Sequence, residues 1–269
     1  MADRLSLRKA HVDLVAGIRA SEEWHPSYKQ TPKQFRALVK AEAELQSQVA
    51  EYLYSLSQRA HRYVDWDEYT RELAKQPMLQ AAAIHADAVA SGSADVWKGE
   101  AIDLTKYIID AINIITAIGV EAAIERYQLT LYVDSVQDFV ARAAEKHVAG
   151  LVSGVTETTR DKIRLSIKQS LTRGETTSQA MERIQKVINN PVRAEMIAQT
   201  ESVNAWSVGQ FNYATATGAT KKVWEALAGA CPLCAPLDGE KVDIDKEFSS
   251  GVMLPAQHPR CRCSVFFEY

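Results

Sequence analysis

Four cysteines and one histidine are the residues whose types and spacing can do chemistry in this sequence. All four cysteines of the 269-residue chain lie between Cys231 and Cys263. Cys231 and Cys234 form a C-x-x-C pair, and Cys261 and Cys263 form a C-x-C pair that His258 precedes by three residues. Structural zinc sites commonly place two thiolates on one tight loop and a second ligand pair elsewhere in the fold. The cluster therefore favours a metal site.

The spacing predicts a zinc site in a small β-rich module. On a strand, Cys261 and Cys263 would point to the same side, about 6 to 7 Å apart along the chain. The 26 residues between Cys234 and Cys261 exceed the usual zinc-ribbon spacing. A closed four-ligand site is structural and contributes folding free energy to a module with little core. We expect structural Zn²⁺ on four of five candidates: Cys231, Cys234, His258, Cys261 and Cys263.

Three other interpretations of these residues stay open. The cysteines could form one or two disulfides or could be plain buried residues, because cysteine is among the most buried residue types. His258 could cap a turn or support a ligand from behind. Arg260 and Arg262 could stabilise thiolates, although an arginine on an exposed strand face is usually solvated.

The common catalytic patterns do not occur in the sequence. It contains no H-E-x-x-H, G-x-S-x-G, P-loop or G-x-G-x-x-G pattern, and no H-x-E precedes Cys231. A catalytic zinc would need an open coordination position and a base such as Asp238 or Glu240. We therefore predict no catalytic residue and no enzymatic activity.

The composition is that of a globular protein, with 46% hydrophobic and 24% charged residues. The net charge of −3 draws the whole molecule neither to nucleic acid nor to an anionic membrane. The most apolar stretch, Ala111 to Val120, is shorter than the ~20 residues that span a bilayer. The first residues have no apolar export region. We expect folding in a cytoplasm and no membrane partner.

Apolar residues at helical spacing predict a mainly α fold with an elongated helical body and a small C-terminal β-rich module (α+β). Start and stop residues set several boundaries, such as Thr31-Pro32, Thr176 and Gly218. The predicted helices are 31–63, 67–89, one around 108–122, one around 131–148, 156–170, 179–188 and 191–217. The predicted strands are 222–226, 240–244 and 261–269. The predicted domains are a helical docking region (1–150), a second helical part (151–218) and the Cys/His module (219–269).

Two polar groups on the predicted helices are further candidates. One face of the helix after Pro191 is expected to form a structural network with the Cys/His module; its members are Arg193, Thr200, Glu201 and Asn204. Residues 151–200 carry a net charge of +3, with eight Lys/Arg against five Asp/Glu. Their cations could contact DNA phosphates without sequence preference, or could be a solvated face. The candidate DNA contacts are Arg160, Lys162, Arg164, Lys168 and Arg173.

A series of motifs runs through the second half of the chain. In order they are RAEMIAQTES (193–202), Gly218, Trp224, CPLCAPLDG (231–239) and PAQHPRCRC (255–263). Over roughly residues 140–267, about half of the chain, this order resembles the phage-Mu-F-like head morphogenesis family of minor capsid proteins. The family's helix reads R-A-x-x-I-A-R-T-E, and Gln199 stands here where an arginine is common.

The resemblance implies a non-enzymatic role at the portal vertex during procapsid assembly. Such minor head proteins are present in few copies, and some leave the particle with the DNA. Partners implied are the portal protein, other capsid proteins and double-stranded DNA. The location implied is the virion, in the head interior or at the portal vertex, after assembly in the host cytoplasm.

The alternative functions are those of a zinc-ribbon-like nucleic-acid-binding protein, a zinc hydrolase or a toxin-associated module.

Overall fold

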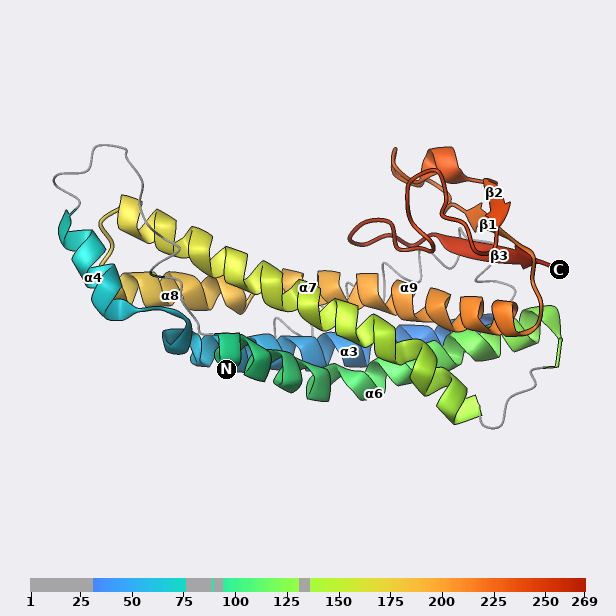
Figure 1. Cartoon of the computed structure of the whole chain (residues 1–269), viewed down its shortest axis with the longest axis horizontal. Coiled ribbons are helices and arrows are strands. Elements are labelled where there is room, and N and C mark those ends of the chain that lie inside the picture. The colour runs from blue at the N-terminus through green and yellow to red at the C-terminus, as the bar shows by residue number, and fades with distance from the viewer. Residues whose placement is uncertain (1–30, 76–88, 90–93, 131–135) are drawn as a thin grey trace. The chain divides into compact units, whose positions relative to one another are not determined.

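The computed structural model describes residues 31–75, 89, 94–130 and 136–269, and most of these are helical (Figure 1). The α-helices are α3 (Pro32–Gln58), α4 (Trp66–Lys75), α6 (Ala94–Tyr127), α7 (Val136–Thr172), α8 (Thr177–Ile188) and α9 (Pro191–Ala216). Two short 3-10 helices are η1 (Ala60–Tyr63) and η3 (Ala235–Leu237). The strands are β1 (Lys221–Glu225), β2 (Lys241–Asp243) and β3 (Ser264–Glu268). The predicted mainly α fold with a C-terminal β-rich module is confirmed.

The predicted start of α3 is confirmed. The amide of Phe35 donates to the carbonyl of Thr31 at 2.9 Å, so Thr31 closes the first turn in front of Pro32. One row of buried residues along the helix repeats every three or four positions; it includes Phe35, Leu38, Glu42, Leu45, Val49, Tyr52 and Leu56. One member of this row, Glu42, carries a carboxylate.

The capping signals around α8 and α9 are also confirmed. The Thr176 side chain accepts from the backbone amide of Gln179, whose own side chain accepts from the amide of Thr176. This reciprocal pair is a capping box. At the far end, Gly218 has φ +87°, and Ala219 N donates to Ala214 O at 2.9 Å, which stops α9.

The predicted helix start at Thr156 is wrong, because α7 continues through it from Val136 to Thr172. The Thr156 hydroxyl donates to the carbonyl of Val152 at 2.6 Å. A threonine hydroxyl that turns back onto its own helix in this way is compatible with a helix interior. The predicted helix 67–89 corresponds to α4 as far as Lys75, and most of its remainder lies outside the described residues.

Helix α6 is long and apolar enough to span a membrane by length and composition alone. In its most apolar window, however, 56% is buried inside the protein. A core helix of a soluble protein passes the same test, so this helix is no argument for a membrane. The absence of a membrane partner stays a prediction.

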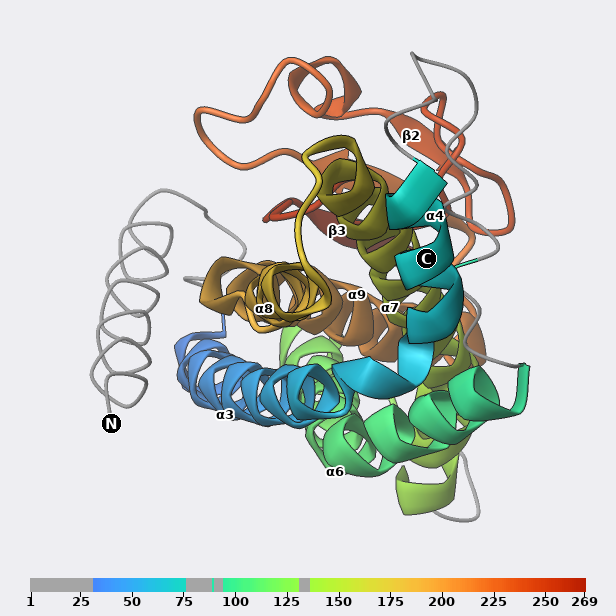
Figure 2. The same ribbon diagram turned by 90° about the vertical axis from the view of Figure 1, so that its left-hand side faces the viewer.

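The three strands form an antiparallel sheet in the order β2-β1-β3. Trp224 on β1 faces Val265 on β3, and Lys222 faces Phe267. Helix α9 packs against β3, as the two views of the ribbon show (Figures 1 and 2). The strand starts at Ser264, so Cys261 and Cys263 precede it, and their predicted position within the strand is wrong.

The chain divides into two compact units, and each gathers segments that are far apart in the sequence. Among the described residues, the first consists of 31–48, 108–130, 136–149 and 191–269, and the second of 49–75, 89, 94–107 and 150–190. The first unit contains the small sheet and all four cysteines. The three domains expected from the sequence stay a prediction.

Candidate metal centre

Two tight turns of the first unit carry four of the predicted ligands. In the first turn, Cys234 N donates to Cys231 O at 3.0 Å. In the second, Cys261 N donates to His258 O at 3.1 Å. Each turn therefore has a candidate ligand at its first and its fourth position, which brings both side chains to one side of the turn. The C-x-x-C turn predicted from the sequence thus has a counterpart in a second turn with the pattern H-x-x-C.

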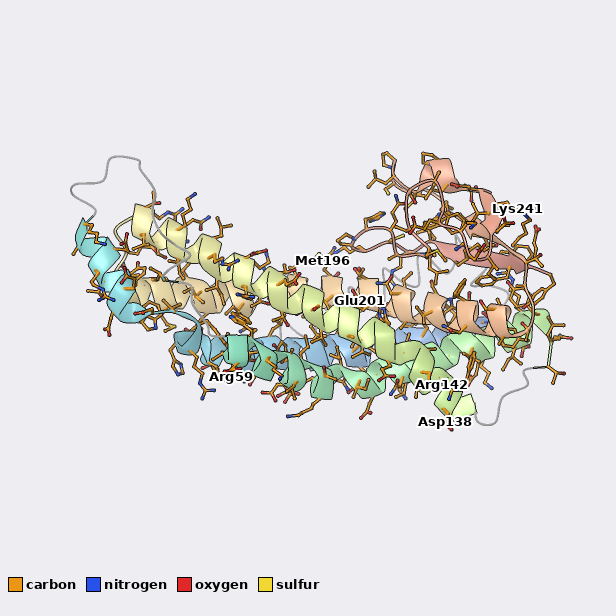
Figure 3. All side chains as sticks on the ribbon, viewed as in Figure 1. Arg59, Asp138, Arg142, Met196, Glu201 and Lys241 are labelled. Carbon is orange, nitrogen blue, oxygen red and sulfur yellow. The ribbon has the colours of Figure 1, made fainter. Side chains whose placement is uncertain are left out.

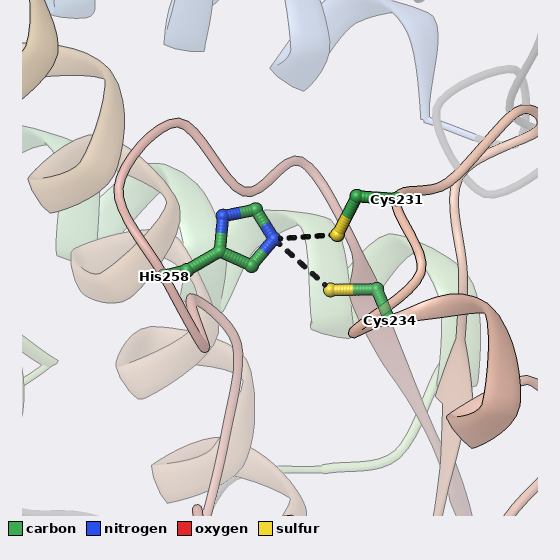
Figure 4. A group of neighbouring side chains, drawn as sticks. All are labelled: Cys231, Cys234 and His258. Atoms are coloured by element: carbon green, nitrogen blue, oxygen red, sulfur yellow. Dashed lines mark hydrogen bonds between the residues drawn. The ribbon is translucent and has the colours of Figure 1, made fainter.

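The two turns face each other (Figure 4). His258 Nε2 lies 3.1 Å from the sulfur of Cys231 and 3.2 Å from that of Cys234. The sulfurs of Cys234 and Cys261 are 3.8 Å apart. Two groups could hold a metal ion, with their ligand atoms within 4.8 Å of one another: Cys231/Cys234/His258 and Cys234/Cys261/Cys263. The structure therefore brings all five predicted ligands together, and Cys234 is common to both groups.

The histidine ring is oriented for ligation. Its Nδ1 lies 2.8 Å from the carbonyl oxygen of Pro259, which can only accept a hydrogen bond, so Nδ1 carries the hydrogen. This hydrogen bond is the main reason why the pKa of His258 is raised, and neighbouring thiolates add to the effect. With the proton held on Nδ1, neutral His258 directs the lone pair of Nε2 at the two sulfurs, as metal-ligating histidines do.

The thiols differ in how readily they ionise. The hydrogen bond from Cys263 lowers the pKa of Cys261 to about 5, although burial opposes it. Burial raises the pKa of Cys234 to about 12. All four cysteines lie within the described residues 136–269 and are free thiols. Thiolate and imidazole donors suit a soft or borderline cation, whose binding would displace the remaining thiol protons.

Helix α9 holds the second turn from behind. The hydroxyl of Thr200 accepts from the amide of Arg260 at 3.0 Å, and Asn204 Oδ1 accepts from the amide of Ala256 at 2.6 Å. Asn204 also donates to Glu201 at 3.0 Å. Three members of the predicted structural network therefore lie on the part of α9 that meets residues 255–263, the candidate metal-binding loop.

The same polar network extends to helix α7 and includes a buried arginine near the start of α9. Glu201, labelled in Figure 3, has its Oε2 3.1 Å from His147 Nε2 on α7. Arg193, the remaining predicted member, is buried near the start of α9. These contacts join α7, α9 and the loop in one polar chain, and a role of that chain in metal binding stays a prediction.

Sequence reasoning missed one partner of this loop. Both guanidinium Nη atoms of Arg262 contact the carboxylate of Glu42 on α3, at 2.6 and 2.8 Å. Arg262 is therefore largely buried and pairs with a carboxylate on α3. A signal existed in the sequence, because Glu42 occupies the apolar position between Leu38 and Leu45 on the buried face of α3. A lone carboxylate at such a position requires a buried partner.

The predicted DNA contacts lie in the second unit, along α7 and just beyond it. Arg160 packs over the ring of Trp97, and Arg164 pairs with Asp161 at 3.2 Å. Arg173 lies 3.9 Å from Glu175. At 100° per residue, Arg160, Arg164 and Lys168 share a side of α7, whereas Lys162 and Arg173 do not. Contact with DNA stays a prediction.

Comparison with known proteins gives one match. Residues 161–266 match the family model described as Phage Mu protein F like protein. This segment contains α8, α9, the three-stranded sheet except the end of β3, and both turns of the metal centre. The match agrees with the family that the motifs resemble. No curated protein and no solved structure matches the chain significantly.

Proposed function

We propose that this protein is a minor capsid protein that acts in phage head morphogenesis. The observation that carries the proposal is the family match over residues 161–266, the segment that contains both metal-binding turns. The proposed role is structural and non-enzymatic, at the portal vertex of the procapsid. The portal protein and other capsid proteins are the proposed partners, and the virion is the proposed location.

The proposed metal is a structural zinc ion. Zinc sites have Zn–S distances of about 2.3 Å and Zn–N distances of about 2.1 Å, so a tetrahedron has edges of about 3.8 Å between sulfurs and about 3.6 Å between sulfur and nitrogen. The Cys234–Cys261 edge is 3.8 Å, and the two edges from His258 Nε2 are 3.1 and 3.2 Å. These three edges are therefore close to those of a tetrahedral zinc site, and the thiolate and imidazole donors are ones that zinc prefers.

We assign the four ligands to the ends of the two turns: Cys231, Cys234, His258 and Cys261. Each turn then contributes its first and fourth residue, and the ion would cross-link the two turns. Cys263 remains as a buried thiol that donates a hydrogen bond to Cys261. Four protein ligands leave no position for water, which argues against a zinc hydrolase.

Two cysteine variants test this assignment because they lie two residues apart. Cys261→Ser should abolish zinc binding, or weaken it strongly, because it removes a ligand. Cys263→Ser should keep one zinc per chain, because it removes only a hydrogen bond to a ligand. The measurement is zinc per chain by elemental analysis of purified protein, with Cys231→Ser/Cys234→Ser as the zinc-free reference. Zinc lost from Cys263→Ser and retained in Cys261→Ser would contradict the assignment.

The role in the head is tested by locating the protein during infection. We expect a tagged chain to copurify with the portal protein and to be detected by mass spectrometry in purified procapsids and virions. Its absence from both particles would contradict the proposal. A matched control is the zinc-free double variant, which should retain its helices and lose incorporation if the Cys/His module is needed for assembly.

Contact with DNA is a separate part of the proposal, supported by the cations of α7. Non-specific binding to phosphates weakens steeply with salt, because each neutralised phosphate releases a counterion. If α7 binds DNA, Lys168→Gln should lower the salt dependence of the affinity for double-stranded DNA. Affinity that does not change with salt would exclude this contact. Strong DNA binding by a protein absent from particles would favour the zinc-ribbon-like alternative.

A further inference from the structure

A buried ion pair joins the metal-binding loop to helix α3. Arg262 and Glu42 form two hydrogen bonds, at 2.6 and 2.8 Å, across 220 positions of the sequence. The side chain of Glu42 has no exposed surface, and that of Arg262 is 14% exposed. This two-bond geometry fixes both the distance between the groups and their orientation.

The pair is a strict constraint, because neither partner is stable alone in this environment. Burying an ionised carboxylate is costly unless an opposite charge and hydrogen bonds compensate for it. Removing Arg262 would leave the Glu42 charge buried without its partner. Glu42 therefore holds the Arg262 side chain, and with it the backbone on either side, in one place.

Arg262 occupies a particular place in the chain, between two of the clustered cysteines. Cys261 is an assigned ligand at the end of the second turn, and Cys263 donates a hydrogen bond to it. Helix α9 anchors the same loop through Thr200 and Asn204. The loop is thus held on α9 by hydrogen bonds from its amides to two side chains, and on α3 by the Arg262–Glu42 pair.

We propose that Glu42 and Arg262 are positioning residues for the metal centre, and that metal occupancy is coupled through them to helix α3. The inference rests on the proposed metal site. A bound cation would cross-link the two turns and fix Cys261, which presets the backbone from which Arg262 reaches Glu42. Without the cation, the turns lose their cross-link, and only the hydrogen bonds to α9 and the ion pair to α3, among the contacts described above, still hold the loop. Such coupling is reciprocal. If metal binding stabilises the ion pair by a given factor, loss of the ion pair must weaken metal binding by that factor.

The first test compares two substitutions on one helix. Glu42→Gln removes the buried charge, whereas Glu44→Gln makes the same chemical change at an exposed position of α3. Zinc affinity is measured on the full chain by competition with a chromophoric chelator. We expect Glu42→Gln to weaken zinc binding about 10- to 100-fold, the usual effect of residues that support metal ligands, and Glu44→Gln to leave it unchanged.

The second test measures hydrogen exchange of the α3 amides around Glu42, residues 38–46, with and without a strong chelator. Removing zinc should speed exchange of this segment in the wild type and in Glu44→Gln. In Glu42→Gln the segment should exchange faster from the start and respond little to the chelator. A merely destabilised protein would exchange faster throughout and would still respond.

The outcomes separate this inference from the metal proposal. A wild type that binds no zinc overturns both. One zinc per chain, with equal affinity in Glu42→Gln and no response of α3 to the chelator, overturns only the coupling. If Glu42→Gln does not fold, Arg262→Lys replaces it, because lysine keeps the charge and loses the two-bond geometry. Coupling then predicts a smaller but measurable loss of zinc affinity, and wild-type affinity contradicts it.

Discussion

At the scale of single residues, the charge state of Lys222 depends on the side chains that bury it. It lies on β1 with no exposed surface, and its Nζ is 5.2 Å from the ring centre of Phe248 and 5.6 Å from that of Phe211. The sulfur of Met253 is 3.7 Å away. Burial lowers the pKa of Lys222 to about 8, although acidic side chains nearby oppose the shift. Aromatic faces thus stabilise the cation only in part.

Replacing this lysine by a hydrophobic residue of similar length should stabilise the protein. At pH 7, Lys222→Met should raise the free energy of unfolding by about 1–2 kcal/mol, because a poorly compensated buried charge disappears. The advantage should shrink as the pH rises from 8 towards 10.5. In that interval the folded wild type has released its proton and the unfolded chain still holds it, so wild-type stability increases with pH. Urea unfolding at pH 7 and pH 10 measures both effects.

The matched control is the neighbouring lysine. Lys221 is half-exposed and pairs with Asp243, so Lys221→Met should change stability by no more than about 1 kcal/mol. A Lys222→Met variant whose advantage is the same at both pH values would show that the folded lysine does not titrate in this range.

At the scale of elements, the first unit depends on a close crossing of α6 and α9. Gly119 on α6 lies against the backbone of Trp206, and Gly209 on α9 lies against the backbone of Thr116. A Cβ atom at either glycine would overlap the carbonyl oxygen opposite it. The crossing positions α9, and α9 carries the side chains that hold the metal-binding loop.

A methyl group at this crossing should therefore destabilise the protein. Gly209→Ala is expected to lower the free energy of unfolding by about 1–3 kcal/mol, because the overlap is with backbone atoms that cannot rotate away. Gly154→Ala is the control, since nothing lies within 4 Å of its added atom on α7. At that position the better helix propensity of alanine should raise the free energy of unfolding by up to about 1 kcal/mol. The measurement is the midpoint of thermal unfolding, followed by circular dichroism, for both variants. Equal shifts of the midpoint in Gly209→Ala and Gly154→Ala would contradict the close packing.

At the scale of the molecule, each compact unit has a polar centre of its own. In the first unit this is the cluster of four cysteines and His258, the candidate metal centre. In the second it is Glu100, which accepts from Arg59 at 2.6 and 3.1 Å and also from the hydroxyl of Tyr63. Tyr63 stacks on Trp97 with ring centres 4.8 Å apart. Helices α3, α6 and α7 contribute residues to both units.

Metal removal should therefore act on one unit. With a strong chelator, we expect faster hydrogen exchange in residues 221–269 and unchanged exchange around Glu100, because each centre is stabilised by its own contacts. The far-ultraviolet circular dichroism should change little, since the helices make up most of the fold. A uniform rise in exchange would mean that the metal stabilises the whole chain.

The sequence alone determined the local features. Pro32, the capping box at Thr176 and the stop at Gly218 follow from the conformations of a few adjacent residues. The ligand types and the C-x-x-C turn are equally local. Where neighbours compete, local signals were misleading: Thr156 is a good cap by type, yet its hydroxyl bonds within α7 and the helix continues.

Only the tertiary structure decided which distant residues meet. The spacing of Cys231 and Cys234 predicts a ligand pair, but the second turn could be placed only once β3 had paired with β1 and α9 had packed beneath the loop. The partner of Glu42 lies 220 positions away, and the burial of Lys222 depends on two aromatic rings from other segments. Such contacts result from packing of the whole unit, because the pattern along a strand or helix specifies which face is buried and leaves open what covers it.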